Sequence, residues 1–382
     1  MYFVSKVTPL FFLLALGCLL TSLILRVIGY SLFDYLPFLV SGFLGMTLTG
    51  AMYQIIPNSQ GRRLKAYPLA FASFLLALLS FLFFALGIPV VGSSLLLLSH
   101  IIFLIQITAT LKNLSPPTVR FLVLSAVFLT FSSLVLFVNY LSGLFTLQGW
   151  VHCLTVGSML SAIYGVELAW IPMLLMESVS IREAQRIFFM KLLSTPPLIA
   201  GFLTLNYGLI LISSVLEIVT ALYFVKVMFS LIRRRRSPVT MTPVLKMFLW
   251  GLAFLLPGIL TGSLMSAFPA VIPAVVDVHI DLLVFGTGLL TIMGGTTHLL
   301  PRIIWQSRKK GTVSDYVDEG KAEFLSRTAP PGILLYLLLN ALNLKIFAFL
   351  LVMAILFVWM RATFLPALMY SIGGKNDEDQ TA

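Results

Sequence analysis

Three stretches of this chain share one spacing: GFLGMTLTGAMYQIIP (Gly42–Pro57), GSMLSAIYGVELAWIP (Gly157–Pro172) and GTGLLTIMGGTTHLLP (Gly286–Pro301). Each reads Gly-x7-Gly-x6-Pro inside an apolar run. With 26 Gly and 19 Pro in 382 residues, chance predicts roughly 0.1 such match per chain, so the recurrence indicates internal repetition. The repeats start more than a hundred residues apart, which is too far for a solenoid and is the length that holds about four membrane helices.

The composition places the chain in a membrane. Hydrophobic residues make up 59% of it and charged residues only 10%, which no soluble domain of this length presents to water. Apolar runs bounded by Pro, Gly and charge predict an all-α protein with about eleven spans, beginning near residues 9, 35, 67, 91, 119, 150, 187, 209, 245, 278 and 333. The last run, 333–360, is interrupted by Asn340, Asn343 and Lys345, and is either one long span or an interfacial piece followed by a span.

Basic residues indicate the orientation because they cluster after the even-numbered spans. They are Arg62, Arg63 and Lys65 after the second span, Lys112 and Arg120 after the fourth, Arg182, Arg186 and Lys191 after the sixth, Arg233 to Arg236 after the eighth, and Arg302, Arg308, Lys309 and Lys310 after the tenth. By the positive-inside rule the N-terminus is cytoplasmic, in the inner membrane of a prokaryote. The net charge of +11 is then an orientation signal, and we expect the lipid bilayer, not nucleic acid, as the partner.

The expected organisation is one polytopic membrane domain over 1–372, with a polar cytoplasmic loop over 302–330 and an acidic disordered tail over 373–382. The two cysteines, Cys18 and Cys153, lie in apolar segments, which excludes a disulfide framework and a thiolate metal site.

The repeat makes the second, sixth and tenth spans equivalent, over 35–57, 150–172 and 278–301. Glycines at this spacing fall on one stripe of a helix, where they admit either a neighbouring backbone or a flat ligand. Both interpretations remain open at this stage.

Two of the four histidines occupy corresponding ends of these helices. The positions seven and five residues before the first glycine hold Trp150 and His152 in the second repeat and His279 and Asp281 in the third. An imidazole within a membrane needs a partner or a ligand, so His152 and His279 are candidate functional residues. The alternative is that both are packed core residues. His100 is expected to be structural, and His298 to lie at the cytoplasmic surface.

The same two helices resemble a known family. His279 to Trp305, HIDLLVFGTGLLTIMGGTTHLLPRIIW, and Trp150 to Pro172, WVHCLTVGSMLSAIYGVELAWIP, resemble helices ten and six of subunit I of the haem-copper oxidases, closest to the C-type oxidase and nitric oxide reductase branch. The resemblance implies a pseudo-three-fold bundle. It also implies that His279 is the proximal ligand of a high-spin haem, with His152 on its distal side or at a residual copper-site position, and with Asp281 and Trp150 nearby.

Most of the family's other ligands are missing from this sequence. Asp281 stands where the second histidine of the His-x-His pair would ligate a low-spin haem, and Pro37 and Tyr35 stand where its partner would lie. The chain reads GFLTLNYG over 201–208, where the family has two adjacent copper ligands. The resemblance therefore implies at most one b-type haem and no copper site, which leaves reduction of dioxygen to water unexpected.

Two functions follow as hypotheses. The first is a haem protein that senses or reduces a diatomic gas such as nitric oxide; were the chain an enzyme, it would be a haem-dependent oxidoreductase, with other respiratory membrane subunits as partners. The second is a cofactor-free scaffold, or a component that transports protons or a small solute. Glu167 and Glu217 are the proton or ion candidates, since a carboxyl group in hydrocarbon is costly unless it is protonated, paired or hydrated.

Overall fold

The computed structural model describes residues 3–235 and 241–373, and they form two compact helical units. Unit 1 spans 1–237 and 262–272, and unit 2 spans 238–261 and 273–382. The sequence predicts a single domain over 1–372, whereas contacts cluster into these two units. The predicted tail, 373–382, lies outside the described residues except for its first residue.

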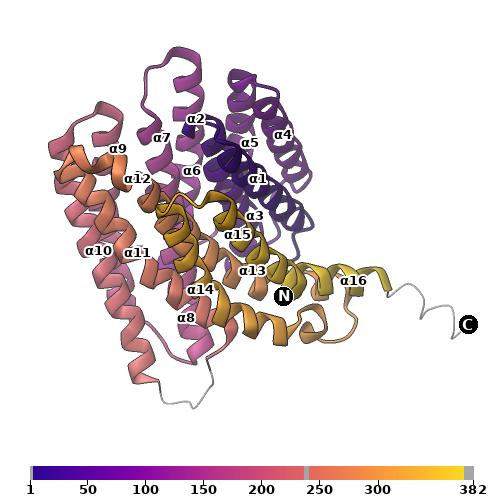
Figure 1. The fold of residues 1–382 in the computed structure, drawn as a ribbon. Helices are drawn as coiled ribbons and strands as arrows, with labels where there is room; N and C mark the ends of the chain where they lie inside the picture. Colours follow the sequence, from indigo (N-terminus) through magenta and orange to yellow (C-terminus); the bar gives the residue numbers. More distant parts are fainter. Residues whose placement is uncertain (1–2, 236–240, 374–382) are drawn as a thin grey trace, which may run out of the picture. The chain divides into compact units, whose positions relative to one another are not determined.

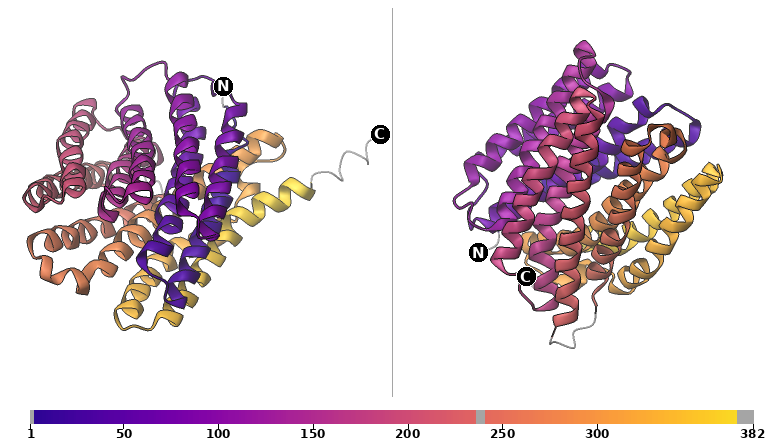
Figure 2. Two further views of the ribbon diagram at one scale, coloured as in Figure 1. Left: turned by 90° about the horizontal axis from the view of Figure 1, so that it is seen from above. Right: turned by 90° about the vertical axis from the view of Figure 1, so that its left-hand side faces the viewer.

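In its described residues unit 1 contains these complete α-helices, shown in Figure 1: α1 (Thr8–Ile28), α2 (Leu32–Leu36), α3 (Met46–Ser59), α4 (Pro68–Ala85), α5 (Pro89–Thr110), α6 (Pro117–Ser142), α7 (Leu147–His152), α8 (Leu160–Leu175), α9 (Ile181–Thr204) and α10 (Tyr207–Arg234). Most of α11 (Pro243–Ala267) belongs to unit 2, together with α12 (Ile272–Asp281), α13 (Leu290–Arg308), α14 (Glu319–Ala341), α15 (Lys345–Trp359) and α16 (Leu365–Gly373). The described residues contain no strand. Neighbours along the chain pack as hairpins, as α9 and α10 do side by side in Figure 2.

Eleven helices in the described part of the chain are long and apolar enough to cross a membrane. The first ten coincide with the first ten predicted spans, and the eleventh runs over Lys345–Met369. The chain is therefore an integral membrane protein of helical type. Large apolar side chains such as Leu82, Ile105 and Leu222 are exposed on these helices, which is the surface that contacts lipid.

The structure distinguishes between the two alternatives for the end of the chain. The apolar run 333–360 does not form one long span, because α14 ends at Ala341 and α15 begins at Lys345, so a separate helical piece precedes the last span. Asn343 ends the first helix with φ +59°, a left-handed conformation that asparagine tolerates better than most residues. The predicted loop over 302–330 is also largely helical, since α13 continues to Arg308 and the Asp318 side chain accepts a hydrogen bond from the Lys321 backbone N–H at the start of α14.

The repeated glycines are contact points between helices. In each repeat the glycine-bearing span packs on the helix directly before it, and a methyl group built on either glycine would collide with that helix. The nearest atoms lie 2.5 to 3.0 Å away, in the pairs Gly42 with Cys18, Gly50 with Phe11, Gly157 with Phe128, Gly165 with Phe121, Gly286 with Phe254, and Gly294 with Phe248. The same two-helix packing thus occurs three times, and close helix approach is sufficient to account for the glycines.

A π-helical segment accompanies the first glycine of every repeat. The segments are η1 (Pro37–Gly45), η2 (Cys153–Met159) and η4 (Leu282–Leu289). Such segments are rare and occur mostly at functional sites. The third one begins directly after Asp281 and the second directly after His152, so the widened turns lie beside the residues that the sequence singles out.

Candidate functional site

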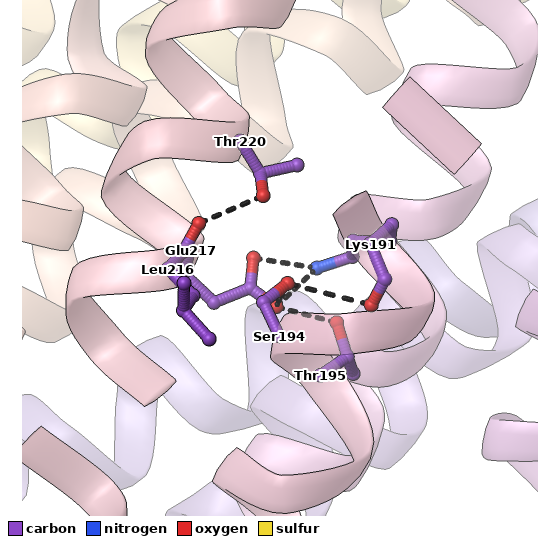
Figure 3. A network of polar contacts seen from close by, with 6 residues as sticks. All are labelled: Lys191, Ser194, Thr195, Leu216, Glu217 and Thr220. Atoms are coloured by element: carbon purple, nitrogen blue, oxygen red, sulfur yellow. Dashed lines mark hydrogen bonds and ion pairs between the residues drawn. The ribbon is translucent and has the colours of Figure 1, made fainter. Parts of the chain in front are cut away.

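A buried ion pair joins α9 and α10 in unit 1. The Lys191 ammonium nitrogen lies 3.0 and 2.9 Å from the two carboxylate oxygens of Glu217. Lys191 is 0% exposed and Glu217 is 2% exposed. Figure 3 shows both side chains converging from the two neighbouring helices. A paired charge at this depth is expensive to desolvate, so it is weak evidence for stability and stronger evidence for a function.

Two hydroxyl groups complete the surroundings of this carboxylate. Ser194 Oγ donates a hydrogen bond to Glu217 Oε1 at 2.9 Å, and Thr195 Oγ1 donates to the same oxygen. Both hydroxyls come from α9, within one turn of Lys191, as Figure 3 shows. Glu217 therefore has one cation and two hydroxyl donors, all from the neighbouring helix.

The position of Lys191 corrects the sequence analysis, which counts this residue among the basic residues at the inner surface. α9 begins at Ile181, where Ser180 and Glu183 form a capping box. Ten residues of helix then place Lys191 roughly 15 Å from that end, within the span. The spacing of the buried residues Ala184, Ile187 and Lys191 is the sequence signal that marks this lysine as part of the inward face.

Tyr164 of α8 lies against the ion pair. The Lys191 nitrogen is 5.7 Å from the centroid of the Tyr164 ring, within the range of a cation–π interaction. The ring also stacks on Phe224 of α10 with 4.1 Å between centroids. Helices α8, α9 and α10 thus meet at this point, and the Tyr164 hydroxyl lies within electrostatic range of both Glu217 and Glu167.

Glu167 is a second buried acid, one helical turn beyond Tyr164. It is 0% exposed, and neither of its carboxylate oxygens has a hydrogen-bond partner within residues 3–235 and 241–373. The Tyr164 and Ser161 hydroxyls on the same helix also lack a partner there. Buried polar atoms without partners are rare in native proteins and mark places where water or another ligand belongs.

The two candidate haem ligands are found in different units. In unit 1, His152 donates from Nδ1 to the Gln148 carbonyl oxygen at 2.8 Å, and its ring stacks on Phe202 with centroids 3.8 Å apart. In unit 2, His279 donates from Nδ1 to the Gly258 carbonyl oxygen at 2.9 Å. A carbonyl can only accept, so in each neutral ring Nε2 carries the lone pair, as it does in metal-bound histidines whose other nitrogen is held by the protein.

The neighbours predicted for these histidines are buried, whereas His152 and His279 themselves are half-buried. Trp150 is 0% exposed, and its indole nitrogen has no hydrogen-bond partner in the described part of the chain. Asp281 is 1% exposed and accepts hydrogen bonds from Tyr336 Oη at 3.3 Å and Asn340 Nδ2 at 3.0 Å. These two partners come from α14, which the sequence analysis had not connected with Asp281.

The remaining histidines differ in outcome. His100 is fully buried, with Nδ1 2.5 Å from Ser133 Oγ and Nε2 3.5 Å from Thr49 Oγ1, which fits the structural role expected for it. His298 is 7% exposed, so a solvated side chain is excluded, and its position at the cytoplasmic interface stays a prediction. Within the described residues, no group of three or more His, Cys, Asp or Glu side chains is placed to hold a metal ion.

One relative of this chain covers nearly its whole length. A protein of Aquifex aeolicus, described as uncharacterized, is 43% identical over 350 residues, which are 90% of this chain and 91% of the relative. No family model matches the sequence. A relation at this level extends over most of the chain and not over a single motif.

Proposed function

We propose that this chain, which belongs to the same family as the Aquifex aeolicus protein, is a membrane protein that moves protons through the α8, α9 and α10 region of unit 1. The observation that carries the proposal is the carboxyl group of Glu167, which is fully buried and has no hydrogen-bond partner in the described chain. Glu167 lies one helical turn from Tyr164, whose ring centroid is 5.7 Å from the Lys191 ammonium nitrogen. A carboxylate with neither cation nor donor is too costly in a span, so Glu167 is held as the neutral acid.

Protons suit this site better than larger solutes. A neutral acid on α8 and an ionised one on α10, with the hydroxyl groups of Tyr164 and Ser161 along α8, supply both a proton source and a proton acceptor. The Tyr164 and Ser161 hydroxyl groups, which have no partner in the described chain, can form hydrogen bonds to internal water molecules that bridge such groups. Acids within spans serve in this way in membrane pumps and transporters.

Proton flux into vesicles tests the proposal. Purified protein is reconstituted into liposomes that enclose a pH-sensitive dye, and a potential drives proton uptake. Glu167→Gln and Glu217→Gln should each abolish uptake, while Glu319→Gln, an exposed glutamate at the start of α14, serves as the matched control and should retain it. Uptake that persists in both buried variants would refute the proposal.

A second candidate function is haem binding, and the hydrogen bonds of His152 and His279 favour it. Each ring presents Nε2 as the electron-pair donor that iron requires. In this proposal His279 of unit 2 would hold the haem iron. The resemblance to a haem-copper oxidase-like bundle without copper is what assigns His152 to the distal side and Asp281 and Trp150 to the surroundings of the haem. A bound b-type haem would supply redox chemistry and the capacity to bind nitric oxide or dioxygen.

An absorption spectrum after expression with ample haem tests this second candidate. The proposal expects a Soret band that His279→Ala removes, with His100→Ala as the control because His100 already has hydroxyl groups at both ring nitrogens. A protein without a Soret band, or a spectrum that His279→Ala leaves unchanged, would exclude it. The orientation and the respiratory partners stay predictions that labelling of the termini and co-purification would test.

A further inference from the structure

The charges buried in unit 1 do not balance. Among the described residues of this unit, the buried side chains of Asp, Glu, Lys and Arg are Glu167, Lys191 and Glu217. Two carboxylates and one ammonium carry a net charge of −1, and one added proton makes the set neutral. A neutral set is strongly favoured in hydrocarbon. The proton therefore resides on one acid while the ammonium pairs with the other, and two such arrangements exist.

The structure shows one of them, with the ammonium on Glu217 and Glu167 without a cation. Tyr164 is close to the ammonium and one turn before Glu167 on α8. Its ring is 5.7 Å from the Lys191 nitrogen, and residues three apart on a helix, such as Tyr164 and Glu167, have Cβ atoms roughly 5–6 Å apart. A lysine side chain, a point charge on a flexible four-carbon stem, can move over such a ring without leaving a favourable contact.

We propose that the Lys191 ammonium is a mobile counter-ion that exchanges between Glu217 and Glu167 across the face of Tyr164. As the ammonium leaves Glu217, the Glu167 O–H bond breaks and a proton is transferred through the hydroxyl groups and water of the site to a Glu217 oxygen, where a new O–H bond forms. The ammonium then pairs with the Glu167 carboxylate. No charge is created or lost, and one proton is displaced from α8 to α10.

The exchange rests on the proposed proton translocation, and it explains why the site contains a lysine. A fixed ion pair would only hold α9 against α10. A mobile one allows each acid in turn to hold the proton while the other is ionised, which is the condition for passing a proton on.

The protonation state of Glu167 tests the exchange without a flux measurement. Infrared spectra of the purified protein report neutral carboxyl groups by their C=O stretch, and the part of the band that Glu167→Gln removes belongs to Glu167. In Glu217→Gln the ammonium has lost its acid, so the exchange predicts that it moves to Glu167 and that this part of the band disappears. A fixed lysine leaves the band unchanged.

The double variant Lys191→Met/Glu217→Gln is the matched control. It has no ammonium, so Glu167 should be neutral again and the band should return. A band that persists in Glu217→Gln, or one that stays absent in the double variant, would overturn the exchange. Should Glu217→Gln fail to fold, Glu217→Asp keeps the charge but draws the carboxylate back by one methylene; the exchange predicts a weakened Glu167 band and a fixed pair predicts the wild-type band.

These results are independent of the flux result. Loss of the band in Glu217→Gln, with proton uptake unaffected by Glu167→Gln, would leave the exchange in place and refute the function. A persistent band, with uptake abolished, would do the reverse.

Discussion

The ion pair of α9 and α10 makes a quantitative prediction for Lys191→Met. Methionine keeps an unbranched side chain of similar length, so the packing changes little. Glu217 loses the cation at 2.9 and 3.0 Å but keeps the hydroxyl groups of Ser194 and Thr195. The perturbation therefore isolates the missing positive charge.

One magnitude sets the expected loss of unfolding free energy. Removing one partner of a buried ion pair leaves the other charge buried without its counter-ion, which costs about 3–5 kcal/mol. We therefore expect Lys191→Met to lower the unfolding free energy by about 3–5 kcal/mol at pH 7.

Equilibrium unfolding in mixed micelles of increasing denaturing detergent content measures this loss at pH 7, against wild type. The double variant Lys191→Met/Glu217→Gln has no buried charge left at this site, and the two changes should be far from additive, with the double variant close to wild type. A Lys191→Met protein within about 0.5 kcal/mol of wild type at pH 7, or a double variant less stable than either single one, would refute the reasoning.

Two further predictions concern the packing and the surface. Gly286→Ala should lower the unfolding free energy by about 1–3 kcal/mol, since the new methyl group would lie 2.6 Å from Phe254. Gly17→Ala is the control: no atom lies within 4 Å of the new methyl group, so it should raise the unfolding free energy by about 0.5–1 kcal/mol in the same detergent titration. Equal effects of the two substitutions would contradict the packing of the repeat. The hydrogen bond from Lys246 holds the pKa of the Glu323 carboxyl below its ordinary value. This lowered pKa contributes stability that is present above the unfolded-state pKa and is lost as the pH falls through the folded-state value. Glu323→Gln should therefore flatten the acid limb of a stability profile by less than about 1 kcal/mol, and an unchanged acid limb would argue against the pair.

The sequence by itself predicts the class of protein, because the composition and the apolar runs depend only on which residues are present and in what order. The first ten spans, the Gly-Gly-Pro recurrence and the two unusual acids, Glu167 and Glu217, all follow from local pattern. The sequence also marks Asn343 as one of the interruptions of the last apolar run. It does not decide between the two alternatives for that run, since hydropathy summed over a window does not register one residue in a left-handed conformation. The resemblance to haem-copper oxidases directed attention to His152 and His279, and their roles stay proposals.

Tertiary structure alone decided which polar groups meet. Lys191 reads as a surface residue in the sequence, where it follows Arg182 and Arg186, and only the start of α9 at Ile181 brings it within the span. Its contact with Glu217 depends on how α9 and α10 are rotated against each other, and the position of Tyr164 depends on a third helix. Helix rotation is set by the packing of many side chains at once, so no local pattern contains it. The repeat illustrates the same point. Its spacing follows from the sequence, but only the structure shows which residues lie against its glycines and therefore that the glycines allow close helix contacts.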